Sequence, residues 1–316
     1  MKPIVAGVAG TVLLAGTLFV GAVISDKILG EANGETQEAA VQTKIPTTAA
    51  AQSVVYAPPS IEEVPDGPMK EAILYGYELV NNTSVAAEEY VGNQLSCTSC
   101  HASAGYDEQV SSLVGVMANY PQYIGRSGDI VTIEERINGC MVRSMNGKKF
   151  DANSKELESM VAYFAYISEG VPIGAKREWA GTSDMKNVPI PDVTNGETLY
   201  GQSCIACHGA DGSGIGANTG PALWGENSFN DGAGVARMSK MAGYIKNNMP
   251  VGAAGTLTDQ DAADLAAFIL SQDRPEWANH DKDWPKGGRP NDIMNKEKRE
   301  QVKNGTIDWE KVLSTN

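Results

Sequence analysis

The sequence predicts an all-α protein in which one small helical unit occurs twice in tandem, and two observations support this prediction. The pentapeptide pattern C-x-x-C-H occurs twice, at residues 97–101 and 204–208. Each copy lies between two segments whose apolar residues recur at helical spacing, and the loops in between are rich in glycine. A repeated motif inside a repeated helical frame indicates two domains of the same kind.

Helices are predicted at the beginning and the end of each unit. The expected ranges are 69–81 and 154–168 in the first unit, then 195–201 and 258–271 in the second. The last of these has the clearest start, because Thr258 is a favourable N-cap and Asp261 follows it at the spacing of a capping box. Its apolar residues Leu265, Phe268 and Ile269 then fall on one face.

Each pentapeptide is the attachment signature of a c-type haem. Two thiols on one helical turn can bond to the two vinyl groups of a porphyrin, and the adjacent imidazole then becomes the proximal iron ligand. We therefore predict two covalently bound haem c groups and two tandem class I cytochrome c-type domains. The residues assigned to the haems are Cys97, Cys100 and His101 in the first domain, then Cys204, Cys207 and His208 in the second.

The distal ligands must come mostly from other residue types, because His280 is the only histidine outside the two motifs. In the second domain Met249 is favoured, since it stands at the end of an expected helix with Pro250 next. Met241 and Lys240 are the alternatives for that position. For Met241, packing around the haem is the preferred interpretation.

The fifth cysteine, Cys140, occupies the corresponding position in the first domain. An inert buried thiol is one interpretation, with Met141 or Met145 as a conventional ligand. The place of Cys140 in the repeat favours it as the distal ligand instead. A thiolate ligand stabilises Fe(III) and lowers the haem potential, whereas methionine raises it.

The N-terminal region predicts export. Residues 4–24 are uncharged and follow Lys2, so segment 1–30 is predicted to be a signal peptide or a retained signal-anchor. Residues 31–65 have the composition of a flexible tether. We expect a periplasmic protein, tethered to the inner membrane if the N-terminal helix is not cleaved. The net charge of −14 argues against a nucleic-acid partner.

The remaining boundaries follow from the helical pattern and from proline and glycine. The first cytochrome domain is expected over 66–170 and the second over 193–273, joined by a linker over 171–192. Residues 274–316 are polar and contain several tryptophans and prolines. We predict that they form an extended C-terminal strap that frays toward its end.

Three segments of the first domain, 121–126, 135–140 and 143–147, resemble the dihaem thiosulfate dehydrogenase and tetrathionate reductase family. Residues 283–287 are also similar. The resemblance implies a periplasmic oxidoreductase that interconverts two thiosulfates and one tetrathionate. It also implies exchange of electrons with an external periplasmic cytochrome c or a membrane redox partner.

The resemblance further implies roles for individual residues. Cys140 would be the distal ligand and catalytic residue of the first haem, Arg126 and Arg136 would bind substrate, and Ser144 would be an active-site serine. Met249 would bind the second iron. Asn248 departs from some family members, which have lysine there and exchange ligands, so we expect no such exchange and an enzyme active in both directions.

The chemistry of the side chains agrees with this assignment. Thiosulfate is a small dianion, and the guanidinium groups of Arg126, Arg136 and Arg143 have the charge and fork geometry for oxyanions. Each arginine also has a simpler interpretation, which is to neutralise a haem propionate. Two other functions remain open: a non-catalytic dihaem electron-transfer cytochrome c, and a Sox-type thiosulfotransferase. Turnover with thiosulfate and release of free tetrathionate distinguish them.

Overall fold

The computed structural model describes residues 54–180 and 184–314, all within one compact unit. The predicted signal segment 1–30 and most of the tether lie outside these residues. Within the described ranges, no helix combines the length and the apolar character needed to cross a membrane.

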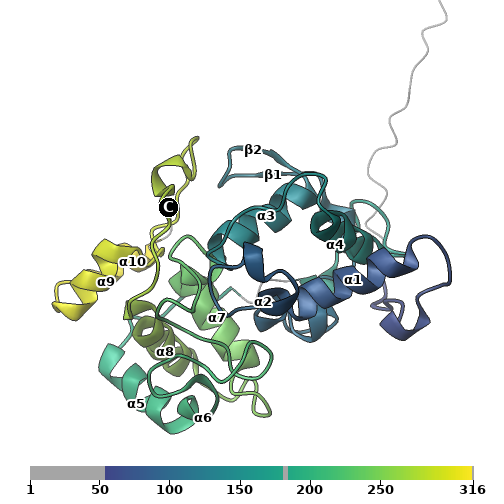
Figure 1. Ribbon diagram of the computed structural model, residues 1–316. Helices are drawn as coiled ribbons and strands as arrows, with labels where there is room; N and C mark the ends of the chain where they lie inside the picture. The colour runs from purple at the N-terminus through teal and green to yellow at the C-terminus, as the bar shows by residue number, and fades with distance from the viewer. Residues whose placement is uncertain (1–53, 181–183, 315–316) are drawn as a thin grey trace, which may run out of the picture. The chain divides into compact units, whose positions relative to one another are not determined.

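The first helical unit contains α1 (Lys70–Asn81), α2 (Thr83–Ala86), α3 (Ile133–Arg143) and α4 (Lys155–Tyr166). Helices α1 and α4 pack against each other and come from opposite ends of the unit in sequence (Figure 1). Helix α3 begins at a complete capping box, in which Thr132 and Glu135 exchange side-chain and backbone hydrogen bonds. Its first residue is thereby fixed, and with it the direction in which Cys140 projects.

The second helical unit contains α5 (Val193–Ser203), α6 (Ile205–His208), α7 (Met238–Asn248) and α8 (Asp259–Ser271). Helix α5 packs against α8, and α7 also packs on α8 (Figure 1). Thr258 is the N-cap of α8 and accepts a hydrogen bond from the Asp261 N–H, as predicted. The two-unit, mainly helical fold is thus confirmed.

The same close helix crossing occurs in both units, and a glycine makes it possible each time. A Cβ added to Gly76 of α1 would lie 2.0 Å from the carbonyl oxygen of Ser159 on α4. A Cβ added to Gly196 of α5 would lie 2.1 Å from the carbonyl oxygen of Asp264 on α8. Any larger residue would push the helices apart, so the repeat extends from the haem motifs to the packing of the helices.

Two features differ from the prediction. A hairpin of β1 (Gln122–Ile124) and β2 (Asp129–Val131) pairs antiparallel before α3, and strands of this length carry no periodic pattern in sequence. The C-terminal segment was predicted to fray toward its end, but it forms two helices, α9 (Lys296–Lys303) and α10 (Trp309–Leu313). Arg299 of α9 is 3% exposed and ion-paired with Asp231, a contact that hydropathy alone does not reveal.

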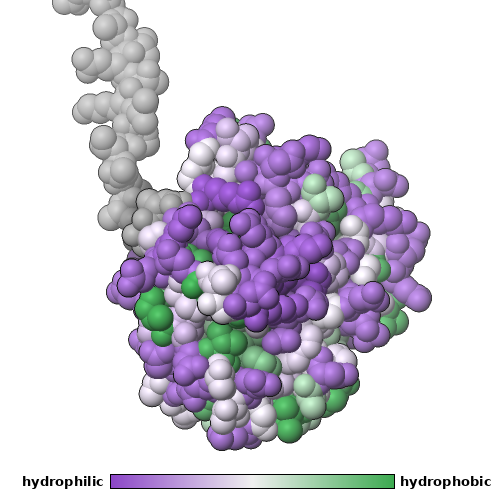
Figure 2. Space-filling view, turned by 90° about the vertical axis from the view of Figure 1, so that its left-hand side faces the viewer, coloured by the Kyte–Doolittle hydropathy of each residue, from purple (hydrophilic) through white to green (hydrophobic). Residues whose placement is uncertain are grey.

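Short 3-10 helices complete the described structure, at Ile61–Glu63, Glu88–Tyr90, Cys97–Ser99, Ser103–Gly105, Val116–Asn119, Glu178–Ala180, Gly234–Ala236 and His280–Lys282. The face of the molecule in Figure 2 is mainly hydrophilic, with smaller hydrophobic patches, in keeping with the high net charge of the chain.

Candidate functional site: two haem pockets and an arginine cluster

The second unit encloses an apolar cavity of about 280 Å³. Cys204, Cys207 and His208 line it, and so do Met249 and Met241. The structure therefore brings the proximal histidine and both candidate methionines to the wall of one cavity. Met249 reaches it as the C-cap residue of α7, directly before Pro250.

The lysine alternatives are held by other partners. Lys240 forms an ion pair with Asp184 at 2.8 Å. Lys246 donates to the carbonyl of Leu257 and lies 3.4 Å from Asp259. Neither lysine lines the cavity, whereas Leu257 does. Lys246 is thus tied to a residue that lines the cavity.

The two motif histidines are oriented in the same way. The Nδ1 atom of His208 lies 2.8 Å from the carbonyl oxygen of Pro221, and that of His101 lies 2.6 Å from the carbonyl oxygen of Ser111. A carbonyl only accepts hydrogen bonds, so Nδ1 carries the proton and the lone pair of Nε2 is left for a metal. Burial lowers the pKa of both imidazoles, which favours the neutral form that binds iron.

These observations fit a covalently attached haem in each unit. The first unit has the same arrangement of thiols and imidazole, and Cys97 is fixed by Thr83, whose Oγ1 accepts from the Cys97 N–H at 2.9 Å. Burial raises the pKa of the Cys97 thiol to about 12 and that of Cys100 to about 11. The nearby charge of Cys140 acts in the same direction, so Cys140 lies beside the attachment cysteines.

Cys140 and Arg136 are in direct contact. They are one turn apart on α3, and Arg136 Nη1 donates to Cys140 Sγ at 2.9 Å. The charge of Cys140 is the largest influence on Arg136 and raises the pKa of its guanidinium, and the neighbouring Tyr120 adds to this. The two side chains thus form one sulfur–guanidinium contact on the same face of α3.

Arg126 lies in a second, adjoining cluster with Arg143 and Asp283. Asp283 Oδ1 accepts from Arg143 Nη2 at 2.9 Å, and Asp283 Oδ2 lies 3.6 Å from Arg126 Nε. Burial lowers the pKa of Arg126 to about 10, although Asp283 opposes the shift. Arg126 therefore stays charged at neutral pH.

Sequence reasoning did not assign a role to Asp283 or to the two tryptophans beside it in space. The guanidinium of Arg126 stacks over Trp284 at 4.4 Å, and that of Arg143 over Trp277 at 4.8 Å. The only signal in the sequence was the similarity of segment 283–287 to the family, which carries no information about contacts.

Ser144 lies at the C-terminal end of α3, directly after Arg143. Its carbonyl oxygen accepts a hydrogen bond from Asn93 Nδ2 at 2.8 Å. The structure thus places Ser144 one turn after Cys140, and the role of its hydroxyl in substrate binding stays a prediction.

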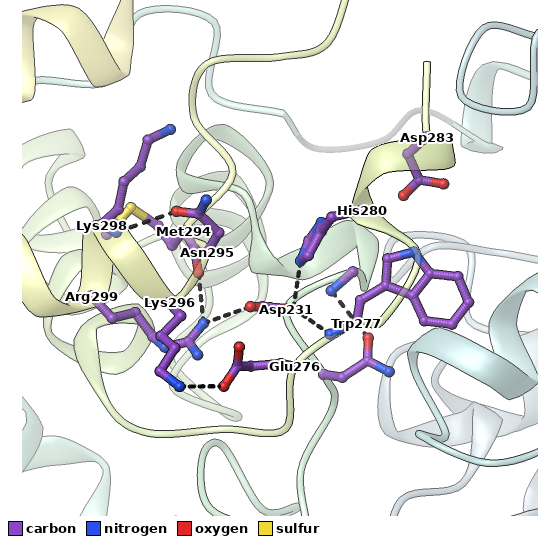
Figure 3. A network of polar contacts seen from close by, with 12 residues as sticks. Asp231, Glu276, Trp277, His280, Asp283, Met294, Asn295, Lys296, Lys298 and Arg299 are labelled. Atoms are coloured by element: carbon purple, nitrogen blue, oxygen red, sulfur yellow. Dashed lines mark hydrogen bonds and ion pairs between the residues drawn. The ribbon is translucent and has the colours of Figure 1, made fainter. Parts of the chain in front are cut away.

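His280 does not line the cavity of the second unit. Its Nε2 atom lies 2.7 Å from Asp231 Oδ1 (Figure 3). Asp231 also accepts from the Trp277 N–H at 2.7 Å and from Arg299 Nη1 at 3.0 Å. The three partners belong to the C-terminal segment, and Asp231 belongs to the second unit.

The haem motif of the first unit lies at the edge of the cavity in the second unit. Leu95, Ser99 and Cys100 contribute to the lining of that cavity. Ser99 Oγ also donates to the carbonyl of Ala217 at 2.9 Å. The two attachment motifs are therefore close in space, which would suit electron transfer between groups attached to them.

Comparison with known proteins agrees with this architecture. Residues 87–173 match the family model "SoxA/TsdA, cytochrome c domain", and residues 193–273 match "Cytochrome c". A thiosulfate dehydrogenase of Psychrobacter arcticus is 41% identical over 239 residues, which cover 74% of this chain and 73% of the relative. One of Allochromatium vinosum is 39% identical, over 71% of this chain and 86% of the relative.

A solved structure is also similar. It is the thiosulfate dehydrogenase (TsdBA) from Marichromatium purpuratum in its as-isolated form, with a TM-score of 0.66 and 32% sequence identity. The match covers 72% of this chain and 51% of that one, so the present chain corresponds to about half of the longer protein. The cytochrome c domains found at both motifs identify the two units as haem c-binding domains.

Proposed function

Because this chain belongs to the thiosulfate dehydrogenase family of oxidoreductases, we propose that it is a periplasmic dihaem enzyme that joins two thiosulfates into one tetrathionate. The two electrons that are released pass to an external cytochrome c. The observation that carries the proposal is the contact between Arg136 and Cys140 beside the first haem motif. Export rests on the uncharged segment 4–24.

Two covalent haems would be held by the paired motifs. When bound, the haems take up the two electrons singly and pass them on. The residues proposed to hold the first haem are Cys97, Cys100, His101 and Cys140, and those for the second are Cys204, Cys207, His208 and Met249.

The arginines answer the main physical difficulty of the reaction. Two thiosulfate dianions become one tetrathionate dianion and two electrons, so four negative charges must first be brought together. At a separation of about 5 Å and an effective dielectric constant of about 20, two dianions repel each other by roughly 13 kcal/mol. Arg136 at Cys140, with Arg126 and Arg143 in the adjoining cluster, offers three guanidinium groups against that repulsion, of which Asp283 offsets one unit of charge.

The second unit is proposed to deliver the electrons to a partner. Three exposed apolar residues, Ile205, Ile215 and Val251, belong to segments around the second haem motif and Met249. Val251 also lines the cavity. An apolar rim at the edge of a haem suits a transient contact with another cytochrome, because it is desolvated without breaking ion pairs.

The same residues serve tetrathionate reduction. Asn248, rather than a lysine, precedes Met249. The residue next to Met249 therefore cannot replace it as iron ligand when the redox state of the second haem changes. We propose that the enzyme works in both directions. Film voltammetry with thiosulfate and tetrathionate together should give catalytic currents of both signs, and a wave only on the oxidising side would contradict this point.

A steady-state assay tests the function. The protein, with two haems confirmed by pyridine haemochrome, should reduce ferricyanide with thiosulfate and release free tetrathionate. Cys140→Met should keep both haems, raise the potential of the first one and remove nearly all turnover. Met141→Leu, a change at a buried neighbour, is the matched control and should remain active. Absence of turnover in the wild type would favour a pure electron-transfer cytochrome. Consumption of thiosulfate without release of tetrathionate would favour a thiosulfotransferase.

A further inference from the structure

The C-terminal strap, residues 274–316, contacts the arginine cluster through Trp277, Asp283 and Trp284. Trp277 lies under the guanidinium of Arg143, Asp283 binds it, and Trp284 lies under Arg126. The Trp284 N–H also donates to the backbone carbonyl of Arg126 at 2.7 Å. Arg126 and Arg143, which belong to the first unit, are therefore held by a segment that follows the second unit in sequence.

We propose that Asp283 is a positioning residue for the reaction, which holds Arg126 and Arg143 as a pair of oxyanion-binding groups. This inference rests on the proposed function, because it takes the arginines as the groups that bind sulfur oxyanions. Asp283 itself does not touch the substrate. Its side chain is 5% exposed and lies between the two guanidiniums.

The geometry leaves donors free for an anion. Arg126 Nη1 donates to the Gly232 carbonyl oxygen at 2.6 Å. This hydrogen bond fixes the orientation of the Arg126 guanidinium. Among the described residues, the buried Arg143 Nε, Trp277 Nε1 and Asp283 Oδ2 of this cluster have no hydrogen-bond partner. Buried N–H groups without a partner are costly, so both would gain from an acceptor if the cluster rearranged around a bound ligand. A small oxyanion is such an acceptor.

The charges point the same way. The positive charges of Arg143 and Arg136 lie near enough to Arg126 to destabilise it, and Asp283 is the negative charge that offsets them. Without Asp283, two guanidinium groups that repel each other would occupy a partly buried site with no fixed counter-ion. A carboxylate that binds both therefore keeps them in one arrangement, at the expense of one unit of positive charge.

The backbone conformation at Trp284 and Gly232 allows the strap to contact the arginines. Trp284 has a φ of 58°, in the left-handed region that residues with side chains rarely adopt. Gly232, whose carbonyl binds Arg126, also makes room for Trp277, because a Cβ there would lie 2.5 Å from the indole Cγ. The rings and the carboxylate thus reach the arginines together.

Asp231 fastens the strap to the second unit. It is 1% exposed and binds the backbone of Trp277, the ring of His280 and the guanidinium of Arg299 (Figure 3). A continuous set of contacts therefore runs from the second unit through Trp277 and Asp283 to Arg143. The arrangement of the arginines in the first unit depends on the strap being in place.

The test uses the full-length, haem-loaded protein and the isosteric variant Asp283→Asn. Because a hydrogen bond to a charged group is lost, we expect KM for thiosulfate, and the dissociation constant of tetrathionate for the oxidised protein by calorimetry, to rise roughly ten- to a hundredfold. The kcat, the potentials of both haems and the electron paramagnetic resonance signal of the first haem should change little. Asp281→Asn, which removes an exposed carboxylate of the same strap, is the control.

Each outcome decides the matter. A KM that is unchanged or lower would mean that Asp283 only weakens the positive field, and the inference would be wrong. A shifted haem potential with an unchanged KM would assign the arginines to propionates, which also overturns it. Should Asp283→Asn fail to take up both haems, Trp284→Leu removes the stacking on Arg126 and should raise KM in the same way. Absence of turnover in the wild type refutes the proposed function instead, and it is measured first.

Discussion

The Asp231 network is expected to be a main source of stability for the C-terminal segment, and the change Asp231→Asn tests this. The variant keeps the shape of the side chain but removes its charge. It also places an amide N–H₂ where Asp231 now accepts hydrogen bonds from Trp277, His280 and Arg299. At least one of these partners must then face another donor.

The magnitude follows from burial. The side chains of Asp231 and Arg299 are 1% and 3% exposed and lie 3.0 Å apart. Removing one partner of such a buried pair leaves an uncompensated charge and typically costs about 3–5 kcal/mol. Since domains are stable by only about 5–15 kcal/mol, the loss should be easy to measure.

The pH dependence has a defined sign. Burial would raise the pKa of Asp231, but hydrogen bonds from His280, the Trp277 N–H and Arg299 outweigh it and hold the pKa below 3.8. A carboxyl whose pKa is lower in the folded state stabilises the fold above its unfolded pKa, and that contribution is lost as the pH falls through the folded pKa. The difference between wild type and Asp231→Asn should therefore be full near neutral pH and shrink below about pH 4.

Urea denaturation followed by far-ultraviolet circular dichroism provides the measurement. Asp273→Asn is the control, because Asp273 pairs with Lys303 at the surface, with exposed fractions of 87% and 45%. Breaking that pair should cost about 0–1 kcal/mol. If Asp231→Asn lost no more than the control, or if its deficit persisted unchanged in acid, the assignment of stability to this buried network would be refuted.

Other predictions concern the second unit. Met249→Gly should abolish the sulfur-to-iron charge-transfer band and leave the first haem unchanged, with the second haem five-coordinate or bound by Lys246 or Lys240; if the band survived, Met241 would be the ligand. Gly196→Ala should destabilise the protein by about 1–3 kcal/mol, because the new Cβ overlaps the backbone of Asp264. Gly201→Ala, in the same helix but with open space around it, should be neutral or stabilising by about 0.5–1 kcal/mol, and equal effects of the two changes in thermal unfolding would contradict the packing argument.

Much of the fold was predictable because its signals are local. The haem motifs combine three reactive side chains within five residues, which needs no knowledge of the rest of the chain. Helix α8 begins where the Thr258–Asp261 capping box predicts, since both partners lie on one turn. The contact between Arg136 and Cys140 belongs to the same class, because residues four apart on a helix share a face.

The tail and the arginine cluster could not be predicted in this way. Residues 274–316 are polar and lack helical periodicity, so a frayed strap was the natural expectation, whereas buried Arg299 stabilises α9 through an ion pair with Asp231. Arg126 was predicted as a substrate residue from the family resemblance. Its stacking on Trp284 involves a segment far away in sequence.

The sequence by itself determined the haem attachment motifs, the repeated helical frame and the family. The spacing of the motif residues and the periodicity of the apolar residues both involve residues that are close together in the sequence. Only the tertiary structure decided what surrounds the arginines. Arg143 and Asp283 are 140 positions apart, and no local pattern relates them. A buried ion pair depends on where two distant backbones meet, since charged residues are expected at the surface until a fold supplies the partner that makes their burial possible.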